Sequence, residues 1–223
     1  MSLPLALVLS YALAFLLGSI PSGVVIGRLF FGVDPRSGGS GSIGATNSNR
    51  MLGAKGGVAV LLCDMLKGAV AVGIARLLIM LGGFEAAAAD TLLMGSVFFG
   101  IAGHIYSPWL GFKGGTGIST GFGSLLVASP GIALGILVVF AVFAVASRIV
   151  SVGSIAAACS VTVWACVFHW GSVPAIAFAL AVSVMVVFAH RANIKRLLAH
   201  EEPRFSLGKS PKEKAAQSGG EQA

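Results

Sequence analysis

Six apolar stretches of roughly bilayer-spanning length divide this chain. They cover about 3–31, 56–81, 92–110, 131–147, 151–169 and 173–190. A bilayer core is crossed by about 20 apolar residues in a helix, and lipid offers backbone N–H and C=O groups no partner outside the helix itself. Only 10% of the residues are charged, far below the proportion of about 25% in soluble domains. The sequence therefore predicts an all-α integral membrane protein.

A shorter apolar stretch, 117–129, decides the expected topology. Cytoplasmic loops collect Lys and Arg. The basic connections are 32–55, 111–116, 147–151 and the tail after 190, and those without a cation are 82–91 and 170–172. All basic segments fall on one side only if 117–129 also crosses. We therefore expect seven transmembrane helices, with the N-terminus outside and the C-terminus in the cytoplasm.

The chain is expected to form one membrane-embedded domain, 1–197, followed by a basic cytoplasmic tail, 198–223. Seven of the 15 Lys and Arg residues lie after position 190, together with four Glu. From 207 onward the tail holds mainly small and polar residues without an apolar period, which is typical of disorder. Its cations favour contact with anionic lipid, and the scarcity of aromatic residues argues against a nucleic-acid partner.

Two glycine-rich polar loops, 39–50 and 111–120, lie on the expected cytoplasmic side. Glycine permits positive φ, and successive backbone N–H groups form concavities that bind anions. Thr46 and Asn47 can cap a following turn, and Arg50 can bind a phosphate through two hydrogen bonds. The candidate phosphate-binding residues are Gly39, Gly41, Ser42, Gly44, Thr46, Asn47, Lys113, Gly114, Gly115, Thr116 and Gly117.

His190 and Asn193 follow the last apolar stretch on the same expected side. Their i,i+3 spacing places them on one helix face, and a histidine can donate, accept or shuttle a proton near neutral pH. The polar end of an interfacial helix explains the pair equally well. Ser151, at the start of another span, could reach the same site.

Ionisable residues also occur within the apolar stretches. Asp64 and Lys67 are three residues apart, and such groups face partners or cavities inside a membrane protein. An ion pair that fixes helix packing and a role in substrate binding are both open. His104 ends a span and could equally be an interfacial anchor.

Taken in order, these motifs resemble the bacterial membrane glycerol-3-phosphate acyltransferases that use acyl phosphate, the PlsY family. The resemblance runs from Leu17 to Leu197. It is carried by Gly18-Ser19-Ile20-Pro21-Ser22-Gly23, Asp34-Pro35-Arg36, the first glycine loop, Arg50, Asp64-Met65-Leu66-Lys67-Gly68, Gly103-His104, Phe112-Lys113-Gly114-Gly115 and His190-Arg191-Ala192-Asn193-Ile194-Lys195-Arg196-Leu197. The resemblance implies a seven-span enzyme without metal or other cofactor.

The implied reaction transfers a fatty acyl group from acyl phosphate to the 1-hydroxyl of glycerol 3-phosphate. Its products are 1-acylglycerol 3-phosphate (lysophosphatidic acid) and phosphate, in the first step of phospholipid synthesis. The resemblance places the enzyme in the inner (cytoplasmic) membrane of a bacterial cell. Membrane lipid and the enzyme that forms acyl phosphate are expected partners.

By the same resemblance, Ser40, Arg50, His190 and Asn193 match the family's polar active-site positions, and Ser151 matches a substrate-contacting serine. Two residues depart from the family pattern. Ser42 stands where the family has Asn, and Thr116 stands where it usually has Lys. The second departure removes a cation from an expected phosphate site.

Two other functions remain open from the sequence. Discontinuous spans with glycine loops also build the sites of transporters, so a transporter of a phosphorylated solute is one alternative. An inactive lipid-binding homologue is the other, because Thr116 replaces the usual Lys.

For an acyltransferase, the mixed anhydride of acyl phosphate is already activated, so holding two phosphates and one hydroxyl together suffices as proximity catalysis.

Overall fold

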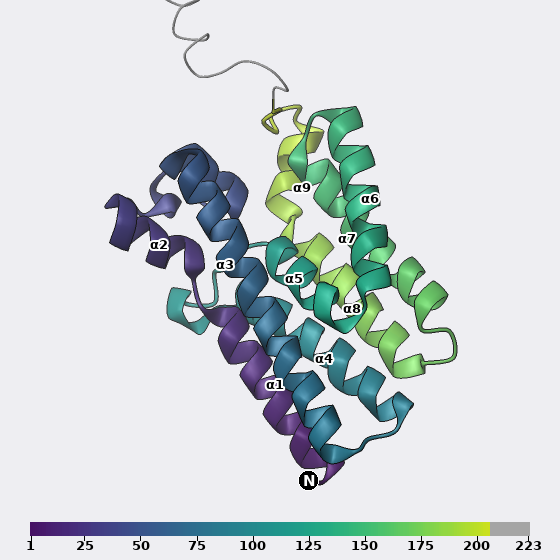
Figure 1. Ribbon diagram of the computed structural model, residues 1–223. Helices are drawn as coiled ribbons and strands as arrows, with labels where there is room; N and C mark the ends of the chain where they lie inside the picture. Colours follow the sequence, from purple (N-terminus) through teal and green to yellow (C-terminus); the bar gives the residue numbers. More distant parts are fainter. Residues whose placement is uncertain (206–223) are drawn as a thin grey trace, which may run out of the picture.

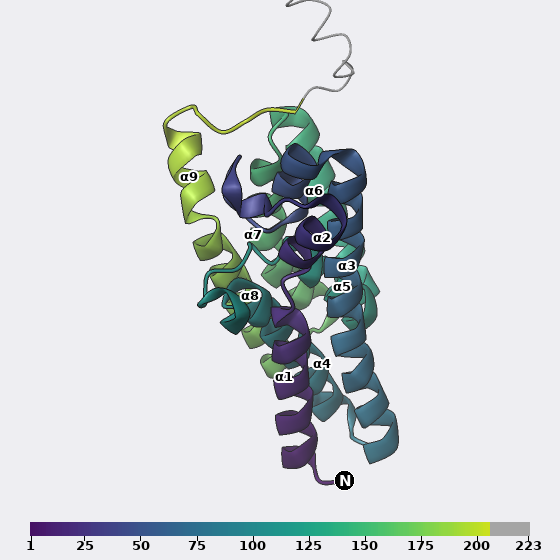
Figure 2. The ribbon, with the colours of Figure 1, turned by 90° about the vertical axis from the view of Figure 1, so that its left-hand side faces the viewer.

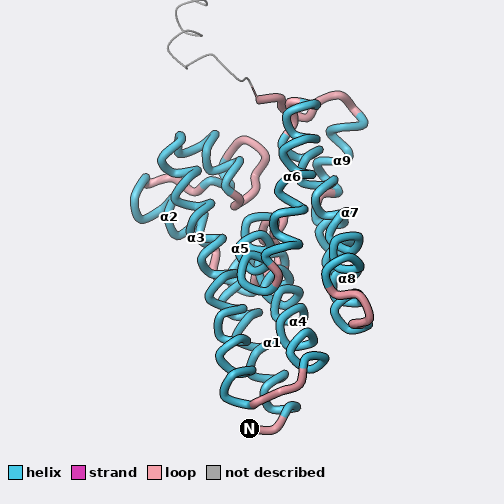
Figure 3. Tube along the Cα trace, turned by 45° about the vertical axis from the view of Figure 1, so that its right-hand side comes forward, coloured by secondary structure: helices cyan, strands magenta, loops and turns pink. Residues whose placement is uncertain are grey.

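The computed structural model describes residues 1–205. Within that range the chain is helical and has no strand (Figure 3). The α-helices are α1 (Leu3–Ser19), α2 (Ser22–Phe31), α3 (Ala45–Gly82), α4 (Ala86–Ile105), α5 (Ile118–Ala128), α6 (Pro130–Ser147), α7 (Val150–Phe168), α8 (Val173–Ala189) and α9 (Arg191–Leu198). Two short 3-10 helices are η1 (Pro35–Ser37) and η2 (Pro108–Leu110). The prediction of an all-α membrane protein is confirmed.

Five segments of the described chain are long and apolar enough to cross a membrane, and α8 with α9 forms a sixth that is bent by 54°. The expected seventh span corresponds to α5, which has only 11 residues. At 1.5 Å per residue it is about 16 Å long, about half the thickness of a bilayer core. The count of seven spans and the orientation of the termini therefore stay predictions.

The first apolar stretch is broken into α1 and α2 at Ile20 and Pro21. Proline has no backbone N–H to continue a helix, and α2 turns away from the axis of α1 (Figure 1). The break frees the Ile20 carbonyl, which accepts a hydrogen bond of 2.7 Å from Lys67 Nζ in α3. The discontinuity therefore brings a cation into the interior of the bundle.

Glycines let the helices of the bundle approach closely. A Cβ on Gly18 of α1 would lie 2.0 Å from the Gly100 carbonyl oxygen of α4, and one on Gly123 of α5 would lie 2.0 Å from the Met65 carbonyl oxygen of α3. Small residues serve helix packing in this way within membranes, where helices gain little from burying apolar surface. The two contacts hold α4 and α5 against the N-terminal helices.

The polar segments gather at one end of the bundle. The N-terminus and the connections α3–α4 and α7–α8 lie toward one end, whereas α2, the first glycine loop, the α6–α7 connection and α9 lie toward the other (Figures 1 and 2). This arrangement agrees with the charge asymmetry of the loops. It places the basic connection 147–149, the first glycine loop and α9 at the same end of the bundle.

Part of the expected tail folds back onto the bundle. The Phe205 N–H donates to the Arg148 carbonyl oxygen at 2.9 Å, and Glu202 contacts α9 through Asn193 and Arg196. The domain boundary expected at 197 thus precedes a segment, 199–205, that is attached to the membrane domain. The disorder expected from 207 onward lies outside the described residues.

Candidate active site

A single cavity of about 1120 Å³ brings the two glycine loops together with the ends of α7 and α8. Every predicted site residue except Gly39 lines this cavity. Those on its wall are Ser40, Gly41, Ser42, Gly44, Thr46, Asn47, Arg50, Lys113, Gly114, Gly115, Thr116, Gly117, Ser151, His190 and Asn193. Residues up to 153 positions apart in the sequence, from Ser40 to Asn193, therefore share one site.

The first glycine loop is organised by one buried amide, that of Asn47. Its Nδ2 donates to the carbonyl oxygens of Pro35, Gly38 and Ser42 at 2.7, 3.3 and 2.8 Å, and its Oδ1 accepts from the Ser40 N–H at 2.8 Å. Asn47 is only 2% exposed. Its amide is thus committed to the loop, and we expect it to act on a ligand through the shape of the loop.

The expectation that Thr46 and Asn47 cap the following turn is wrong. The N-cap of α3 is Gly44, so both residues lie inside the first turn of the helix. Gly39 and Gly41 have φ values of +61° and +68°, the left-handed conformation that glycine tolerates. Gly39 also packs against Asn47, since a Cβ there would lie 2.2 Å from Asn47 Oδ1. This contact explains its position behind the cavity wall.

The start of the same loop is fixed by a charge cluster. Asp34 accepts hydrogen bonds from the Arg36 backbone N–H at 3.0 Å and from Arg36 Nη2 at 2.7 Å, and from Arg28 Nη2 at 2.9 Å. The hydrogen bonds from the Arg36 side chain hold the pKa of the Asp34 carboxyl well below its usual range. The carboxylate therefore stays ionised and anchors η1.

The second glycine loop is held by the backbone of α4. The Gly114 and Gly115 N–H groups donate to the carbonyl oxygens of Ile105 and His104 at 2.9 and 3.1 Å. A Cβ on Gly114 would lie 1.9 Å from the His104 carbonyl oxygen. These glycines thus allow close approach, and their N–H groups already have partners.

Helix N-termini supply further N–H groups for an anion. The first turn of α3, Ala45 to Asn47, and the start of α5 at Ile118 both line the cavity. The first N–H groups of a helix have no intrahelical partner, and the helix dipole adds a favourable field for negative charge. The first N–H groups of α3 and α5 are therefore anion-binding candidates in addition to the predicted loop residues.

The far wall is formed by residues near the bend between α8 and α9. His190 is 3% exposed, and its Nδ1 lies 2.8 Å from the Val186 carbonyl oxygen. A carbonyl can only accept, so Nδ1 carries the proton. In the neutral ring, Nε2 is then left as an acceptor.

Asn193 Nδ2 donates to Glu202 Oε1 at 2.8 Å, and Arg196 Nε donates to Glu202 Oε2 at 2.6 Å. Burial opposes ionisation of Glu202, but these hydrogen bonds outweigh it and lower the pKa of the carboxyl. The buried Ser151 hydroxyl lies near this carboxylate without meeting hydrogen-bond geometry.

Cations outnumber carboxylates on the cavity wall. The cations on the wall are Arg50, Lys113, Arg191, Arg196 and Arg204, and the carboxylates are Asp64 and Glu202. Both carboxylates are paired, Asp64 with Lys67 and Glu202 with Arg196. The remaining positive charge favours an anionic ligand.

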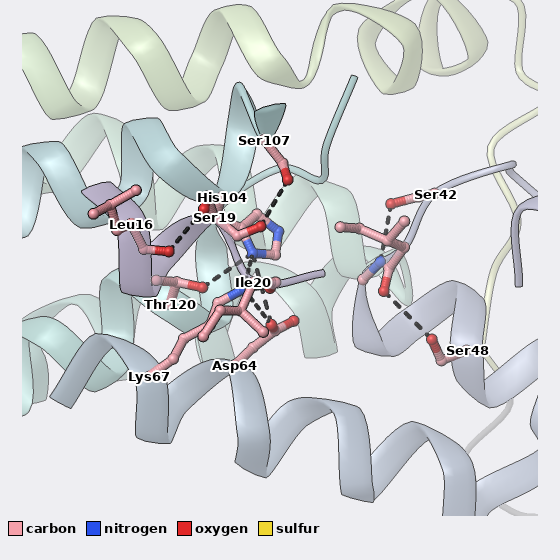
Figure 4. Close-up of polar contacts among 12 residues, drawn as sticks. Leu16, Ser19, Ile20, Ser42, Ser48, Asp64, Lys67, His104, Ser107 and Thr120 are labelled. Atoms are coloured by element: carbon pink, nitrogen blue, oxygen red, sulfur yellow. Dashed lines mark hydrogen bonds and ion pairs between the residues drawn. The ribbon is translucent and has the colours of Figure 1, made fainter. Parts of the chain in front are cut away.

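Four residues that were not predicted as site residues also line the cavity: Glu202, Arg204, His104 and Asp64. His104 is 3% exposed and belongs to an internal polar cluster (Figure 4), so its interpretation as an interfacial anchor is wrong. The available signal was an ionisable residue inside an apolar stretch. Glu202 and Arg204 gave no periodic signal, because 199–205 is irregular.

An apolar region continues the same cavity between the helices. Its wall is formed by the helices α5 to α8, with Leu125, Ile136, Phe140, Val161, Val182 and Val186. The cavity is thus polar and cationic on one side and aliphatic on the other. This division suits an amphipathic ligand with a phosphate group and a hydrocarbon chain.

The chain belongs to the glycerol-3-phosphate acyltransferase family, whose model matches residues 8–200. It is 45% identical over 196 residues to a glycerol-3-phosphate acyltransferase of Anaeromyxobacter sp. (strain Fw109-5), covering 88% of this chain and 95% of that one. It is 38% identical over 192 residues to the enzyme of that name from Geobacillus kaustophilus (strain HTA426), covering 86% and 92%.

Solved structures with the same fold are those of PlsY, an integral membrane glycerol 3-phosphate acyltransferase. Its glycerol 3-phosphate form superposes with a TM-score of 0.79 at 36% identity, covering 89% of this chain and 95% of that one. The lysophosphatidic acid form gives a TM-score of 0.75 at 34% identity, with the same coverage. The resemblance noted in the sequence is thus confirmed at the level of family and fold.

Proposed function

We propose that this protein transfers a fatty acyl group from acyl phosphate to the 1-hydroxyl of glycerol 3-phosphate. The products are 1-acylglycerol 3-phosphate and inorganic phosphate. The observation that carries the proposal is the single cavity that joins two helix N-termini, an excess of cations and an aliphatic region. Family membership and the ligands named for the two PlsY structures support the same substrate and product.

The reaction needs two phosphates and one hydroxyl held close together, which is proximity catalysis. Arg50 and the N-terminus of α3 would bind one phosphate, and Lys113 and the N-terminus of α5 the other. The glycerol oxygen attacks the acyl carbon, the bond from that carbon to the phosphate oxygen breaks, and the hydroxyl proton passes to the departing phosphate. Ser40 and Ser151 would donate hydrogen bonds to substrate oxygens.

His190 and Asn193 would position glycerol 3-phosphate. With its Nδ1 proton held by Val186, neutral His190 presents Nε2 as an acceptor, which suits the hydrogen of a substrate hydroxyl. Glu202 holds the Asn193 amide at 2.8 Å and thereby orients it. The acyl chain would occupy the aliphatic region between α5, α6, α7 and α8.

The donor can be tested with purified protein and radiolabelled glycerol 3-phosphate. We expect product from acyl phosphate and none from acyl-CoA. Equal rates with acyl-CoA alone would contradict the proposed donor. Uptake of glycerol 3-phosphate into sealed vesicles without acylation would instead support the transporter alternative.

We further infer a seven-span topology in the inner membrane, with the site facing the cytoplasm, where the enzyme that forms acyl phosphate could supply the donor. The charge asymmetry of the loops supports this orientation. In a variant without Cys63, Cys159 and Cys166, single cysteines at Gly208 and Ala87 should be labelled from opposite sides. Labelling of both from one side would contradict the topology.

A further inference from the structure

Helices α3, α4 and α5 and the break between α1 and α2 contribute to a polar cluster around Lys67 (Figure 4). Lys67 Nζ forms an ion pair of 2.8 Å with Asp64 Oδ1. It also donates to the Ile20 carbonyl oxygen at 2.7 Å and contacts His104 Nδ1 at 3.0 Å. Asp64, Lys67 and His104 are all buried. The ammonium group is thus surrounded by three acceptors inside the bundle.

These contacts determine which nitrogen of His104 carries the proton. An ammonium group can only donate, so Nδ1 must accept from Lys67. The Thr120 hydroxyl lies 3.1 Å from the same nitrogen, whereas Asp64 Oδ1 is 3.7 Å away, beyond hydrogen-bond reach. A neutral imidazole that accepts at Nδ1 carries its hydrogen on Nε2.

The Nε2 edge of His104 faces the second loop and the cavity. Both hydrogen bonds that the ring makes within residues 1–205 involve Nδ1, and His104 lines the cavity wall. Gly115 leaves space before the ring, because a Cβ at that position would lie 2.2 Å from Nε2. An N–H donor that has no hydrogen-bond partner among the described residues therefore points toward the region next to the N-terminus of α5.

We propose that His104 Nε2–H donates a hydrogen bond to a phosphoryl oxygen of the substrate held at the N-terminus of α5. Lys67 is a positioning residue, because it fixes the tautomer that makes this donor available. The inference rests on the proposed function for the identity of the phosphoryl substrate. The His104 side chain would supply a donor beside a loop whose Gly114 and Gly115 N–H groups already have partners and whose Thr116 carries no charge.

Two substitutions separate this role from a purely structural one. His104→Asn keeps an acceptor near the Nδ1 position for Lys67 and Thr120 but removes the donor at Nε2. His104→Gln places an amide N–H near the Nε2 position and disturbs the contact with Lys67. Binding of glycerol 3-phosphate and of inorganic phosphate should be measured by calorimetry in detergent. We expect His104→Asn to lower one of these affinities about tenfold and His104→Gln to stay within about threefold of the wild type.

The reverse order, with His104→Asn unchanged and His104→Gln weakened, would show that the ring only supports packing and would overturn the proposal. Equal affinities for all three proteins would also overturn it. If a variant does not fold, a measurement on the wild-type protein still tests the proposal. The ¹⁵N signals of labelled histidine should report the Nε2–H tautomer and shift at Nε2 when phosphate or glycerol 3-phosphate is added. A ring that shows the Nδ1–H tautomer, or no shift at saturation, contradicts the assignment.

The acyl-transfer assay on the same preparations separates the two proposals. If phosphate binding depends on His104 but no acyl transfer occurs, the proposed function fails and the donor role stands. If the wild type transfers acyl groups and His104→Asn retains both the KM and the affinities, the donor role fails alone. A selective rise in KM for acyl phosphate or for glycerol 3-phosphate would identify which phosphate the ring contacts.

Discussion

The two glycine loops have similar composition but use glycine for different reasons. In the first loop, Gly39 and Gly41 adopt positive φ, and the turns are held by the Asn47 side chain. In the second loop, Gly114 and Gly115 press against the last carbonyls of α4. Gly111 and Gly117 of the second loop also have positive φ, +60° and +82°. The contrast therefore lies in the buried amide that holds the first loop and in the close backbone approach at Gly114 in the second.

In both loops the scaffold itself uses glycine N–H groups. Gly41 donates to the Gly38 carbonyl oxygen at 3.1 Å and Gly44 to Ser42 Oγ at 3.2 Å, as Gly114 and Gly115 donate to α4. These glycines therefore shape the loops, and in the proposed function the first N–H groups of the following helices would bind the anion. The loops also differ in charge, since the first is followed by Arg50 and the second contains Lys113 and Thr116.

The largest expected effect is on activity, from Arg50→Ala. Arg50 lines the cavity, and its guanidinium can bind a phosphate through two hydrogen bonds. We expect a loss of about a thousandfold in kcat/KM, of the size seen when a transition-state donor is removed. Arg50→Lys keeps the charge without the planar fork and should recover only part of the rate. Wild-type kinetics in the Arg50→Ala enzyme would show that Arg50 does not bind the phosphate.

The second prediction tests the two uses of glycine directly. Gly114→Ala places a Cβ 1.9 Å from a backbone oxygen, so we expect a loss of about 3 kcal/mol in unfolding free energy from overpacking. Gly41→Ala meets no atom closer than 3.9 Å and should cost about 1 kcal/mol for its positive φ. Thermal unfolding in detergent measures both. Equal losses would contradict the distinction between the loops.

The third prediction concerns the amide that organises the first loop. Asn47→Ala removes hydrogen bonds to three carbonyls and one N–H, and we expect a loss of about 2 kcal/mol. Asn47→Asp retains the acceptor for the Ser40 N–H but sets a carboxylate oxygen against the three carbonyls. It should therefore be at least as unstable as Asn47→Ala. An Asn47→Asp protein as stable as the wild type would show that the amide nitrogen does not hold the loop.

Much of the fold could be predicted because a bilayer core restricts the backbone to few structures. Apolar length and the need to satisfy the backbone internally point to helices, and these are present. The break at Pro21 and the short length of α5 were harder to predict from the sequence, because both depend on packing. Gly123 packs against Met65 and so holds α5, which is too short to cross a bilayer by itself. The mean apolarity of a segment does not reveal such a contact.

The membership of the site was also largely predictable, since small, polar and cationic residues stand out between apolar stretches. Their roles were harder to assign. The sequence gives no sign that Asn47 points back into the loop or that the Gly114 N–H is already bonded. His104 was missed as a site residue because its importance depends on Lys67, 37 positions away.

A smaller effect on activity than that of Arg50→Ala is expected from restoring a cation to the second loop. Thr116 lines the cavity just before the N-cap of α5, Gly117. If this position faces phosphate, Thr116→Lys adds a charge-assisted hydrogen bond worth about 1.5–3 kcal/mol, or roughly ten- to a hundredfold in affinity. The gain should lower the KM for acyl phosphate and shrink at high salt. If Thr116→Lys changes nothing while Lys113→Ala raises that KM, Lys113 supplies the charge. If neither change matters, the second loop binds no phosphate, and the resemblance between the loops ends at their composition.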